Sequence, residues 1–417
     1  MEIKMNALKG LDIAGKKILF RPDINSPIDP ETKKIVNDNR LKKNAATLQY
    51  MLDNGAAVAL IAHQGDTQDY QNLIPLAEHA EKLSMLTGHK VSYIDDVCGP
   101  AAQAAVRDLP AGECVILGNL RYLGEELSTF GNFVKLTPEQ AKHVWHVRTL
   151  APLFDLYVND AFSAAHRDAP SMVAFPALLP SAAGFQFFTE YEALSNVLNG
   201  AEHPSMFVLG GAKISDAFGM MEPVLKNGTA DKILTTGVTG IIMHLARGVK
   251  FGEKQMQFLK DRDMLTFVEP AKKYLEMFSD SFELPRDLAF EKDGARHEVM
   301  VTAEMPDELF CDVGAQTIAD YRALLATAKT IFANGPAGMY ENAVFENGTK
   351  GVWQAIADSD AYSVIGGGDT VTSATKFVGK EKFGYVCTAG GAMVRFMSGK
   401  KLPLIAAMEQ SYERCKL

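Results

Sequence analysis

The sequence predicts an α/β protein made of two doubly wound parallel-sheet domains joined by a hinge helix. Three observations predict this fold. The chain has 417 residues, which exceeds the usual size of one hydrophobic core and favours two domains. Short apolar runs alternate along it with longer segments of helical periodicity. Polar or glycine-rich residues follow these runs directly, as they do where a buried strand ends in a turn.

Ten short apolar runs are predicted as strands. Those in the first half are Lys17–Phe20, Ala57–Ala62, Cys114–Leu117 and Leu156–Asn159. Those in the second half are Ser205–Leu209, Lys232–Thr235, Leu309–Val313, Thr330–Ala333, Tyr362–Ile365 and Tyr385–Thr388. Helix-length segments between them include Arg40–Asn54, Leu73–Thr87, Ser215–Lys226 and Thr317–Ala328. Strands that alternate with helices indicate parallel sheets with right-handed crossovers.

The break between the halves is predicted around Phe175–Gly184, where two prolines and a glycine interrupt the pattern. Phe188–Leu198 then reads as a helix that connects the domains. We therefore expect one domain at residues 1–184 and a second at residues 185–404. The C-terminal tail, from about residue 405 to 417, is expected to pack back on the first domain.

Composition narrows the class of protein. The formal net charge of −9 argues against bulk attraction to nucleic acid or to anionic membranes. The five cysteines are scattered and form no C-x-x-C pair, which favours reduced thiols in the cytoplasm. Residues 1–6 do not resemble a signal peptide, and no run approaches the ~18 apolar residues that span a bilayer. We expect a cytoplasmic protein without nucleic-acid or membrane partners.

Basic and polar residues follow the strands of the first half. Arg21–Pro27 follows the first strand, and His63, Arg121 and Arg167 follow the next three. Together with Arg40, at the start of the first long helix, these arginines could converge on a small polyanion, because guanidinium groups bind phosphate and carboxylate oxygens well. Each arginine taken singly is also compatible with a solvated surface group.

Glycine turns follow the strands of the second half. Gly210 and Gly211 precede Lys213, whose ammonium can act as a point charge on a transferring phosphoryl group. Gly366–Thr370 places three glycines, a carboxylate and a hydroxyl at a predicted helix start, where backbone N–H groups can receive phosphate and Asp369 can hold Mg²⁺. Further glycine turns lie at residues 334–338 and 388–391. The chain contains no P-loop motif, so the nucleotide would be held differently.

Two other clusters of chemically active residues have plainer interpretations. His143 and His146 could face the same way on a helix, but without a third metal ligand in view they are predicted to be structural or exposed. The acidic pairs Asp95-Asp96 and Glu125-Glu126 are predicted to be solvated.

These motifs, in this order, resemble the phosphoglycerate kinase family. Ala62-His63-Gln64 and the segment Asn227–Gly237 resemble its archaeal members in particular. The resemblance begins at Arg21–Pro27 and continues through Asn119–Tyr122 and Asn159–Phe162 with His166-Arg167. It then includes Gly210–Lys213, Asp312–Gly314, Asn334–Gly338, Glu341 and Gly366–Thr370, and so extends over nearly the whole chain.

The resemblance implies reversible phosphoryl transfer between 1,3-bisphosphoglycerate with ADP and 3-phosphoglycerate with ATP, assisted by Mg²⁺, in a hinge-closing enzyme that we expect to be a monomer. The implied catalytic residues are Arg40, Lys213, Gly367 and Gly390. The implied phosphoglycerate-binding residues are Asp23, Ile24, Asn25, Arg40, His63, Gln64, Gly65, Asp66, Arg121 and Arg167. The implied nucleotide-binding residues are Gly211, Lys213, Asn334, Glu341, Gly366, Gly367, Gly368, Asp369 and Thr370, with Asp369 next to the metal.

The chain departs from the family pattern at two places that bear on function. Asp66 stands where the family usually has an arginine that contacts the substrate phosphate, and Ala389 stands where a glycine is common. Asp66 could face solvent while Lys42 or Lys43 helps instead, or the substrate could bind more weakly, or the acceptor could be another carboxylate. A kinase of the same fold for a different carboxylate and a catalytically silent nucleotide sensor are the competing hypotheses.

Overall fold

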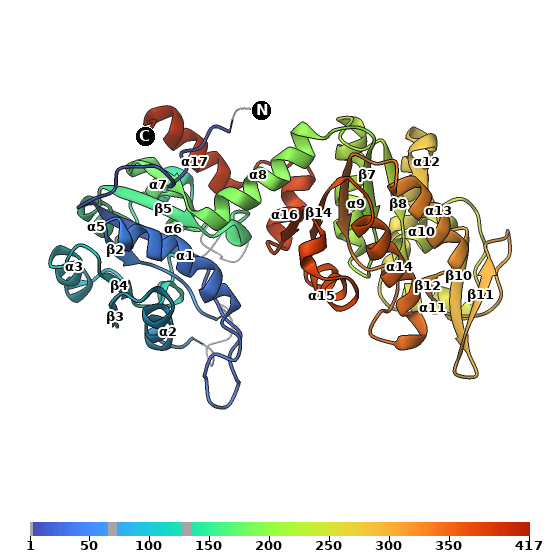
Figure 1. The fold of residues 1–417 in the computed structure, drawn as a ribbon, viewed down its shortest axis with the longest axis horizontal. Coiled ribbons are helices and arrows are strands. Elements are labelled where there is room, and N and C mark those ends of the chain that lie inside the picture. Colours follow the sequence, from blue (N-terminus) through green and yellow to red (C-terminus); the bar gives the residue numbers. More distant parts are fainter. Residues whose placement is uncertain (1–2, 66–72, 127–135) are drawn as a thin grey trace. The chain divides into compact units, whose positions relative to one another are not determined.

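The computed structural model describes residues 3–65, 73–126 and 136–417, which form two compact units (Figure 1). One unit extends to Glu192 and also contains Lys401–Leu417, and the other is Ala193–Lys400. Each contains a six-stranded parallel sheet, so the predicted α/β class with two parallel sheets is confirmed. In the described part of the chain, no helix is long and apolar enough to cross a membrane.

The sheet of the first unit has the strand order β3-β4-β2-β1-β5-β6. Its strands are β1 (Lys17–Pro22), β2 (Ala57–Leu60), β3 (Val91–Ile94), β4 (Cys114–Leu117), β5 (Leu156–Asp160) and β6 (Ser181–Ala183). The four strands predicted in this half are confirmed, and all residues of β2, β4 and β5 are buried. A strand that is covered on both faces reads as an unbroken apolar run, which explains why these were recognisable.

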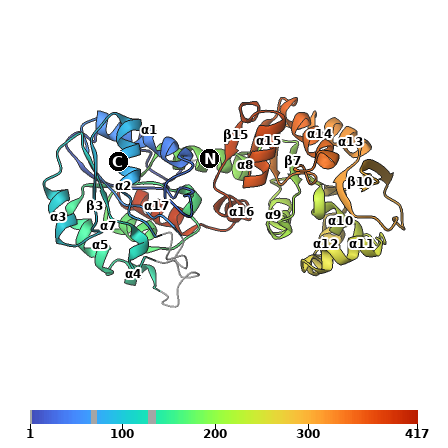
Figure 2. The same ribbon diagram turned by 90° about the horizontal axis from the view of Figure 1, so that it is seen from below.

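Helices cover this sheet on its faces (Figures 1 and 2). They are α1 (Asn39–Asp53), α2 (Ala77–Thr87), α3 (Pro100–Arg107), α4 (Pro138–Ala141), α5 (Trp145–Leu150), α6 (Pro170–Val173), α7 (Phe175–Leu178) and α17 (Pro403–Arg414). Leu41 and Leu48 of α1 and Leu83 of α2 join Phe20 and Val58 of the strands in one buried cluster. The apolar stripes of α1 and α2 therefore anchor the segments that lead into and out of the strand ends.

The second unit contains the sheet β15-β14-β13-β7-β8-β9 and a separate three-stranded sheet. The parallel strands are β7 (Ser205–Leu209), β8 (Lys232–Thr235), β9 (Phe282–Glu283), β13 (Thr330–Asn334), β14 (Tyr362–Gly366) and β15 (Tyr385–Cys387). The helices are α9 (Ile214–Lys226), α10 (Gly237–Ala246), α11 (Glu253–Lys260), α12 (Val268–Met277), α13 (Ala315–Leu325), α14 (Glu346–Ala357), α15 (Gly368–Phe377) and α16 (Gly391–Met397). Figure 2 shows α13, α14 and α15 on one side of this sheet and α9, α10 and α12 on the other.

One predicted strand belongs to a different sheet from the one expected. The segment 309–313 forms β12 (Phe310–Val313), which pairs antiparallel with β10 (Asp287–Lys292), and β10 pairs antiparallel with β11 (Ala295–Met300). The cause is a two-residue hairpin at Asp293 and Gly294, which both have positive φ. An Asp-Gly pair of this kind favours a tight hairpin, here between β10 and β11. β12 pairs with the other edge of β10 and so joins this sheet instead of the parallel one.

Helix α8 (Phe185–Gly200) contains the predicted connecting helix, and the boundary between the two compact units lies within it. The segment 175–184, where we expected the break, holds α7 and β6 of the first unit. The domain limits 1–184 and 185–404 remain predictions. In the C-terminal helix α17, the side chain of Arg414 donates hydrogen bonds to the carbonyl oxygens of Pro176, Ala177 and Leu179.

The strand order of each sheet reverses once, and this reversal positions the candidate sites. In the first unit β1 lies between β2 and β5, and the carboxyl ends of β1 and β5 meet where Arg21 pairs with Asn159. In the second unit β7 lies between β8 and β13, and Leu209 pairs with Asn334 at the corresponding ends. Open α/β sheets bind ligands in the crevice outside such strand ends.

A buried carboxylate at the end of β5, Asp160, contacts the first turn of α8 and gives a prediction about pH and stability. Asp160 accepts hydrogen bonds from Phe187 N at 2.8 Å and from Thr47 Oγ1 at 2.6 Å. Burial, helped by the nearby charge of Glu190, raises the pKa of Asp160 to about 7. The native state then holds a proton that the unfolded state releases near pH 4, so stability falls as pH rises from about 4 to 7.

Asp160→Asn is expected to remove this slope, which one proton sets at up to about 1.4 kcal/mol per pH unit. The measurement is the free energy of unfolding in urea at several pH values between 4.5 and 8. The control is Asp155→Asn, which makes the same change at an exposed position just before β5. An unchanged slope in Asp160→Asn would show that another group is responsible.

Candidate functional site

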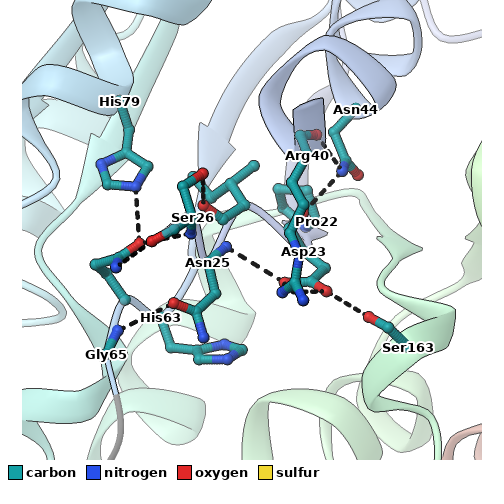
Figure 3. A network of polar contacts seen from close by, with 12 residues as sticks. Pro22, Asp23, Asn25, Ser26, Arg40, Asn44, His63, Gly65, His79 and Ser163 are labelled. Carbon is teal, nitrogen blue, oxygen red and sulfur yellow. Dashed lines mark hydrogen bonds and ion pairs between the residues drawn. The ribbon is translucent and has the colours of Figure 1, made fainter. Parts of the chain in front are cut away.

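The loop after β1 is held by a dense network of hydrogen bonds (Figure 3). Arg40, in the first turn of α1, donates from Nη1 to both carboxylate oxygens of Asp23 at 3.0 Å. Ser163 also donates to Asp23 Oδ2, and Asn44 donates to the carbonyl oxygens of Asp23 and Arg40. Asp23 therefore fixes the direction of the Arg40 guanidinium, whose side chain is still 48% exposed.

Gln64 connects this loop to the neighbouring strand exits. Its side-chain amide pairs with the backbone of Ser26, accepting from N and donating to O at 2.8 Å each. Its backbone exchanges hydrogen bonds with the side chain of Asn119, and its Oε1 lies 3.1 Å from Nε2 of the buried His79. Gly65 N donates to Asn25 Oδ1 (Figure 3). The exits of β1, β2 and β4 are thus locked together.

A pocket beside these loops is strongly basic. Its lining includes Arg21, His63, Arg121 and Arg167, and also the carboxylate of Glu126. Burial, followed by the charges of Arg21, Arg121, Arg167 and Arg40, lowers the pKa of His63 well below its usual value. His63 is therefore neutral, and the cationic groups around it suit an anion.

Some of the predicted phosphoglycerate-binding residues line the basic pocket, and others are buried and shape its loops. His63, Arg121 and Arg167 line one pocket together with Arg21, whereas Arg40, which was expected to converge with them, is not among the described residues that line it. Ile24 and Gln64 are buried instead, and the side chain of Gln64 is turned toward the protein. Their contact with substrate remains a prediction, and what they visibly do is shape the loop. Asp66 lies outside the described residues, and Lys42 forms an ion pair with Asp38 at 2.8 Å.

The second unit brings its glycine turns into close backbone contact. Gly210 N donates to Asn334 O at 2.9 Å, Gly211 N to Pro336 O at 2.8 Å, and Gly237 N to Ala337 O at 3.1 Å. A Cβ atom at Gly335, where φ is +91°, would collide with the backbone of Gly210, so the loops can meet only without side chains there. This close packing builds one wall of a second pocket.

That second pocket is lined by the loops after β7, β13 and β14 and by the segment after β15. Its lining residues are Gly210, Gly211, Ala212, Lys213, Asp216, Asn334, Gly335, Pro336, Gly367, Gly368, Asp369, Thr370, Gly390, Gly391 and Val394. Helix α15 begins at Gly368, directly after Gly367 with φ of +104°, so its first N–H groups belong to this wall. A helix N-terminus of this kind receives phosphate oxygens.

Charged groups of both signs line the second pocket. Lys213 is exposed, and no carboxylate lies within 4 Å of its ammonium in the described residues. Asp216 is one turn further along α9, and burial raises its pKa above the usual value, although the charge of Lys213 offsets part of this rise. Asp369 lies in the first turn of α15. The pocket therefore combines an exposed cation with carboxylates that suit a metal ion.

Two predicted nucleotide-binding residues, Asn334 and Thr370, use their side chains to hold the backbone of the pocket wall. Asn334 Nδ2 donates to Gly366 O at 2.7 Å, and Gly335 N donates to the hydroxyl of Thr370 at 2.7 Å. Glu341 is exposed in the same unit, but neither it nor Gly366 is among the described residues that line the pocket. Their roles toward a nucleotide stay predictions.

The second departure from the family pattern causes no backbone strain. Ala389 is buried, and the described non-glycine residues with positive φ are Lys33, Asp263 and Asp293. The positive φ falls instead on Gly390, at +49°. An alanine at residue 389 is therefore compatible with the turn.

The interpretation of the acidic pair Glu125-Glu126 as solvated is wrong for one of its members. Glu125 is exposed, but Glu126 is buried among polar groups. His146, predicted to be structural or exposed, is fully buried and contacts Glu126.

Asp216 was missed as a residue of the second pocket, although its place one helical turn after Lys213 indicates that the two share a face.

Strand exits that are basic in one unit and rich in glycine in the other, each at a reversal of strand order, are typical of a phosphotransferase with separate sites for a small anion and a nucleotide. That is the class that the fold and the two pockets define.

Comparisons with known proteins give the family. The family model "Phosphoglycerate kinase" matches residues 8–400. Phosphoglycerate kinase of Methanothermobacter thermautotrophicus is 37% identical over 99% of this chain and 98% of that protein, and that of Thermococcus kodakarensis is 39% identical over 96% of each. The crystal structure of phosphoglycerate kinase from Pyrococcus horikoshii OT3 is similar with a TM-score of 0.84 and 35% identity, covering 99% of this chain and 100% of that one. The chain belongs to the phosphoglycerate kinase family.

Proposed function

We propose that this enzyme transfers a phosphoryl group reversibly between 1,3-bisphosphoglycerate with ADP and 3-phosphoglycerate with ATP. The observation that carries the proposal is the difference in chemistry between the linings of the two pockets. Three arginines with a neutral histidine line the first, and glycine turns, a lysine and a helix N-terminus line the second. The basic pocket suits a small phosphorylated carboxylate, and the glycine pocket suits the phosphates of a nucleotide.

The residues present explain how such a transfer is promoted. Phosphoryl transfer needs positioning and charge neutralisation more than covalent participation, and the acceptor carboxylate is already ionised. Arg40, oriented by Asp23, and Lys213, beside the N-terminus of α15, are the cations that would neutralise oxygens of the transferring group. Backbone N–H groups at Gly367 and Gly368 would add fixed dipoles.

We propose that the nucleotide binds together with Mg²⁺, and the oxygen donors of the glycine pocket suit this ion. Asp369 supplies a carboxylate oxygen on the wall of the glycine pocket, and Mg²⁺ prefers oxygen ligands. In the described segments, no group of three or more His, Cys, Asp or Glu side chains could hold a metal by itself. Phosphate oxygens of the nucleotide would complete the coordination, and the ion would neutralise their charge.

We propose that the enzyme works as a monomer in the cytoplasm. One chain carries both pockets, so no second copy is required to complete either of them. The five cysteines all lie in the described part of the chain and form no disulfide bond there, which supports a reducing compartment.

A coupled assay with 3-phosphoglycerate, MgATP and a panel of other carboxylates tests the proposal. We expect turnover to be fastest with 3-phosphoglycerate. Faster turnover of another carboxylate would favour a kinase of the same fold for a different acceptor. That hypothesis arises because Asp66 stands in place of the family arginine. Tight MgATP binding without turnover on any acceptor would identify a nucleotide sensor.

A further inference from the structure

A buried acid–base pair, Glu126 with His146, has no assigned role in the proposed reaction, although Glu126 lines the basic pocket. Glu126 is 4% exposed and His146 is fully buried, and His146 Nε2 lies 3.0 Å from Glu126 Oε2. The same carboxylate accepts hydrogen bonds from the backbone N of Ser171 at 2.9 Å and from the hydroxyl of Ser171. Three donors therefore converge on one carboxylate that also lines the pocket.

Glu126 is ionised in this setting. Burial raises its pKa, but the hydrogen bond and charge of His146, the charge of Arg21 and the hydroxyl of Ser171 together lower the pKa below its usual value. An ionised carboxylate only accepts hydrogen bonds. The hydroxyl of Ser171 must therefore donate to Glu126, and its oxygen remains free to accept from another group.

That other group is Arg21. Its Nε donates to Ser171 Oγ at 3.1 Å, its Nη1 to Pro22 O at 2.6 Å, and its Nη2 lies 2.9 Å from His63 Nδ1. Among the described residues, protein groups thus fix three of the five N–H groups of the guanidinium, which leaves two for a ligand. A planar guanidinium held at three points cannot rotate, so these two N–H groups have a set direction.

The arginine in turn decides the protonation of His63. A guanidinium has no acceptor, so Nδ1 of His63 must accept the hydrogen bond from Arg21, and the proton of the neutral ring is on Nε2. His63 can then offer only a donor to a substrate oxygen in the basic pocket. In the other tautomer it would offer a lone pair, which repels a carboxylate or phosphate.

We propose that Glu126, Ser171 and His146 form a buried positioning chain that sets the direction of the Arg21 guanidinium and, through it, the Nε2–H tautomer of His63 for binding the acceptor. The chain is continuous from His146 to Glu126, Ser171, Arg21 and His63. Its effect on catalysis rests on the proposed function of the basic pocket.

The position of Glu126 favours this role over simple fold stabilisation. A carboxylate on the wall of an anion pocket opposes the anion by charge, and its desolvation carries a further cost. We expect such an arrangement if orienting Arg21 increases the affinity for the anion by more than the negative charge of Glu126 decreases it.

The test compares two buried serine-to-alanine variants in the same unit. Ser171→Ala breaks the chain, whereas Ser411→Ala removes a buried hydroxyl of α17 that donates to Leu179 O, away from the pocket. We expect Ser171→Ala to raise the KM for 3-phosphoglycerate about tenfold, the loss of one charge-assisted hydrogen bond, and to leave the KM for MgATP unchanged. Ser411→Ala is expected to change neither value.

A second readout does not depend on turnover. In ¹⁵N-histidine-labelled protein, with the His63 signal assigned by its loss in His63→Gln, we expect a pure Nε2–H ring in the wild type and a mixture of tautomers in Ser171→Ala. Glu126→Gln, which keeps the shape but puts an NH₂ group against one of three donors, should act in the same direction. It provides the test if Ser171→Ala does not fold.

An unchanged tautomer, or a KM for 3-phosphoglycerate that rises no more in Ser171→Ala and Glu126→Gln than in Ser411→Ala, would overturn the positioning chain. Absence of wild-type turnover on 3-phosphoglycerate would instead count against the proposed function. In that case the tautomer of His63 still decides whether the chain fixes the ring.

Discussion

Lys213→Ala is expected to lower kcat at least about a hundredfold, because the ammonium would lose its place beside the charge that develops in the transition state. Lys213 is exposed and lines the glycine pocket next to Asp369 and the start of α15. No carboxylate of the described chain neutralises it at ion-pair distance, so its full charge is available to the phosphoryl group. The measurement is the steady-state rate with saturating MgATP and 3-phosphoglycerate.

The control for this variant is on the same helix. Lys226→Ala makes the identical change at the far end of α9, where Lys226 pairs with Glu222 on the surface. We expect Lys226→Ala to retain the wild-type rate. If Lys213→Ala also retained it, the lysine would have no part in the chemical step.

Arg40→Ala is the second variant with a large expected effect, again a fall in kcat of at least about a hundredfold. Arg40 is held by both oxygens of Asp23, yet about half of its side chain faces solvent. A guanidinium that is already oriented loses little entropy when it meets the transition state. Removing it should therefore lower kcat and kcat/KM together, which marks an interaction made mainly in the transition state.

Arg107→Ala is the matched control, because Arg107 lies exposed at the end of α3 and contacts Gln103. We expect it to behave as wild type. A rise in the KM for 3-phosphoglycerate in Arg40→Ala, with kcat unchanged, would instead limit Arg40 to ground-state binding.

Strands that are buried on both faces were predictable because their sequences leave few alternatives. β2 and β4 are wholly buried, and every predicted strand has a counterpart in the structure. β3 was missed because Val91 is its one buried residue, at the edge of the sheet, so the apolar signal is weak. β10 and β11 were missed because their hairpin depends on the turn at Asp293 and Gly294 and not on an apolar run.

The candidate sites were predictable to the extent that they depend on residues directly after strands. Arg21, Lys213 and Gly367 line pockets because the carboxyl ends of parallel strands meet at one edge of a sheet. Burial of a polar side chain was not predictable, since it depends on distant partners. The side chain of Gln64 is turned inward by contacts with Ser26 and His79, and that of Glu126 by contacts with Ser171 and His146.

The central claim is that the basic pocket selects a phosphorylated three-carbon acid as the partner of the nucleotide. The most direct test compares 3-phosphoglycerate with glycerate, which lacks the phosphate, at saturating MgATP. We predict that kcat/KM is lower for glycerate by at least about a hundredfold, the loss of roughly two charge-assisted hydrogen bonds to arginine. Equal kcat/KM for the two acids would contradict the account, because the arginines of the pocket would then recognise no phosphate.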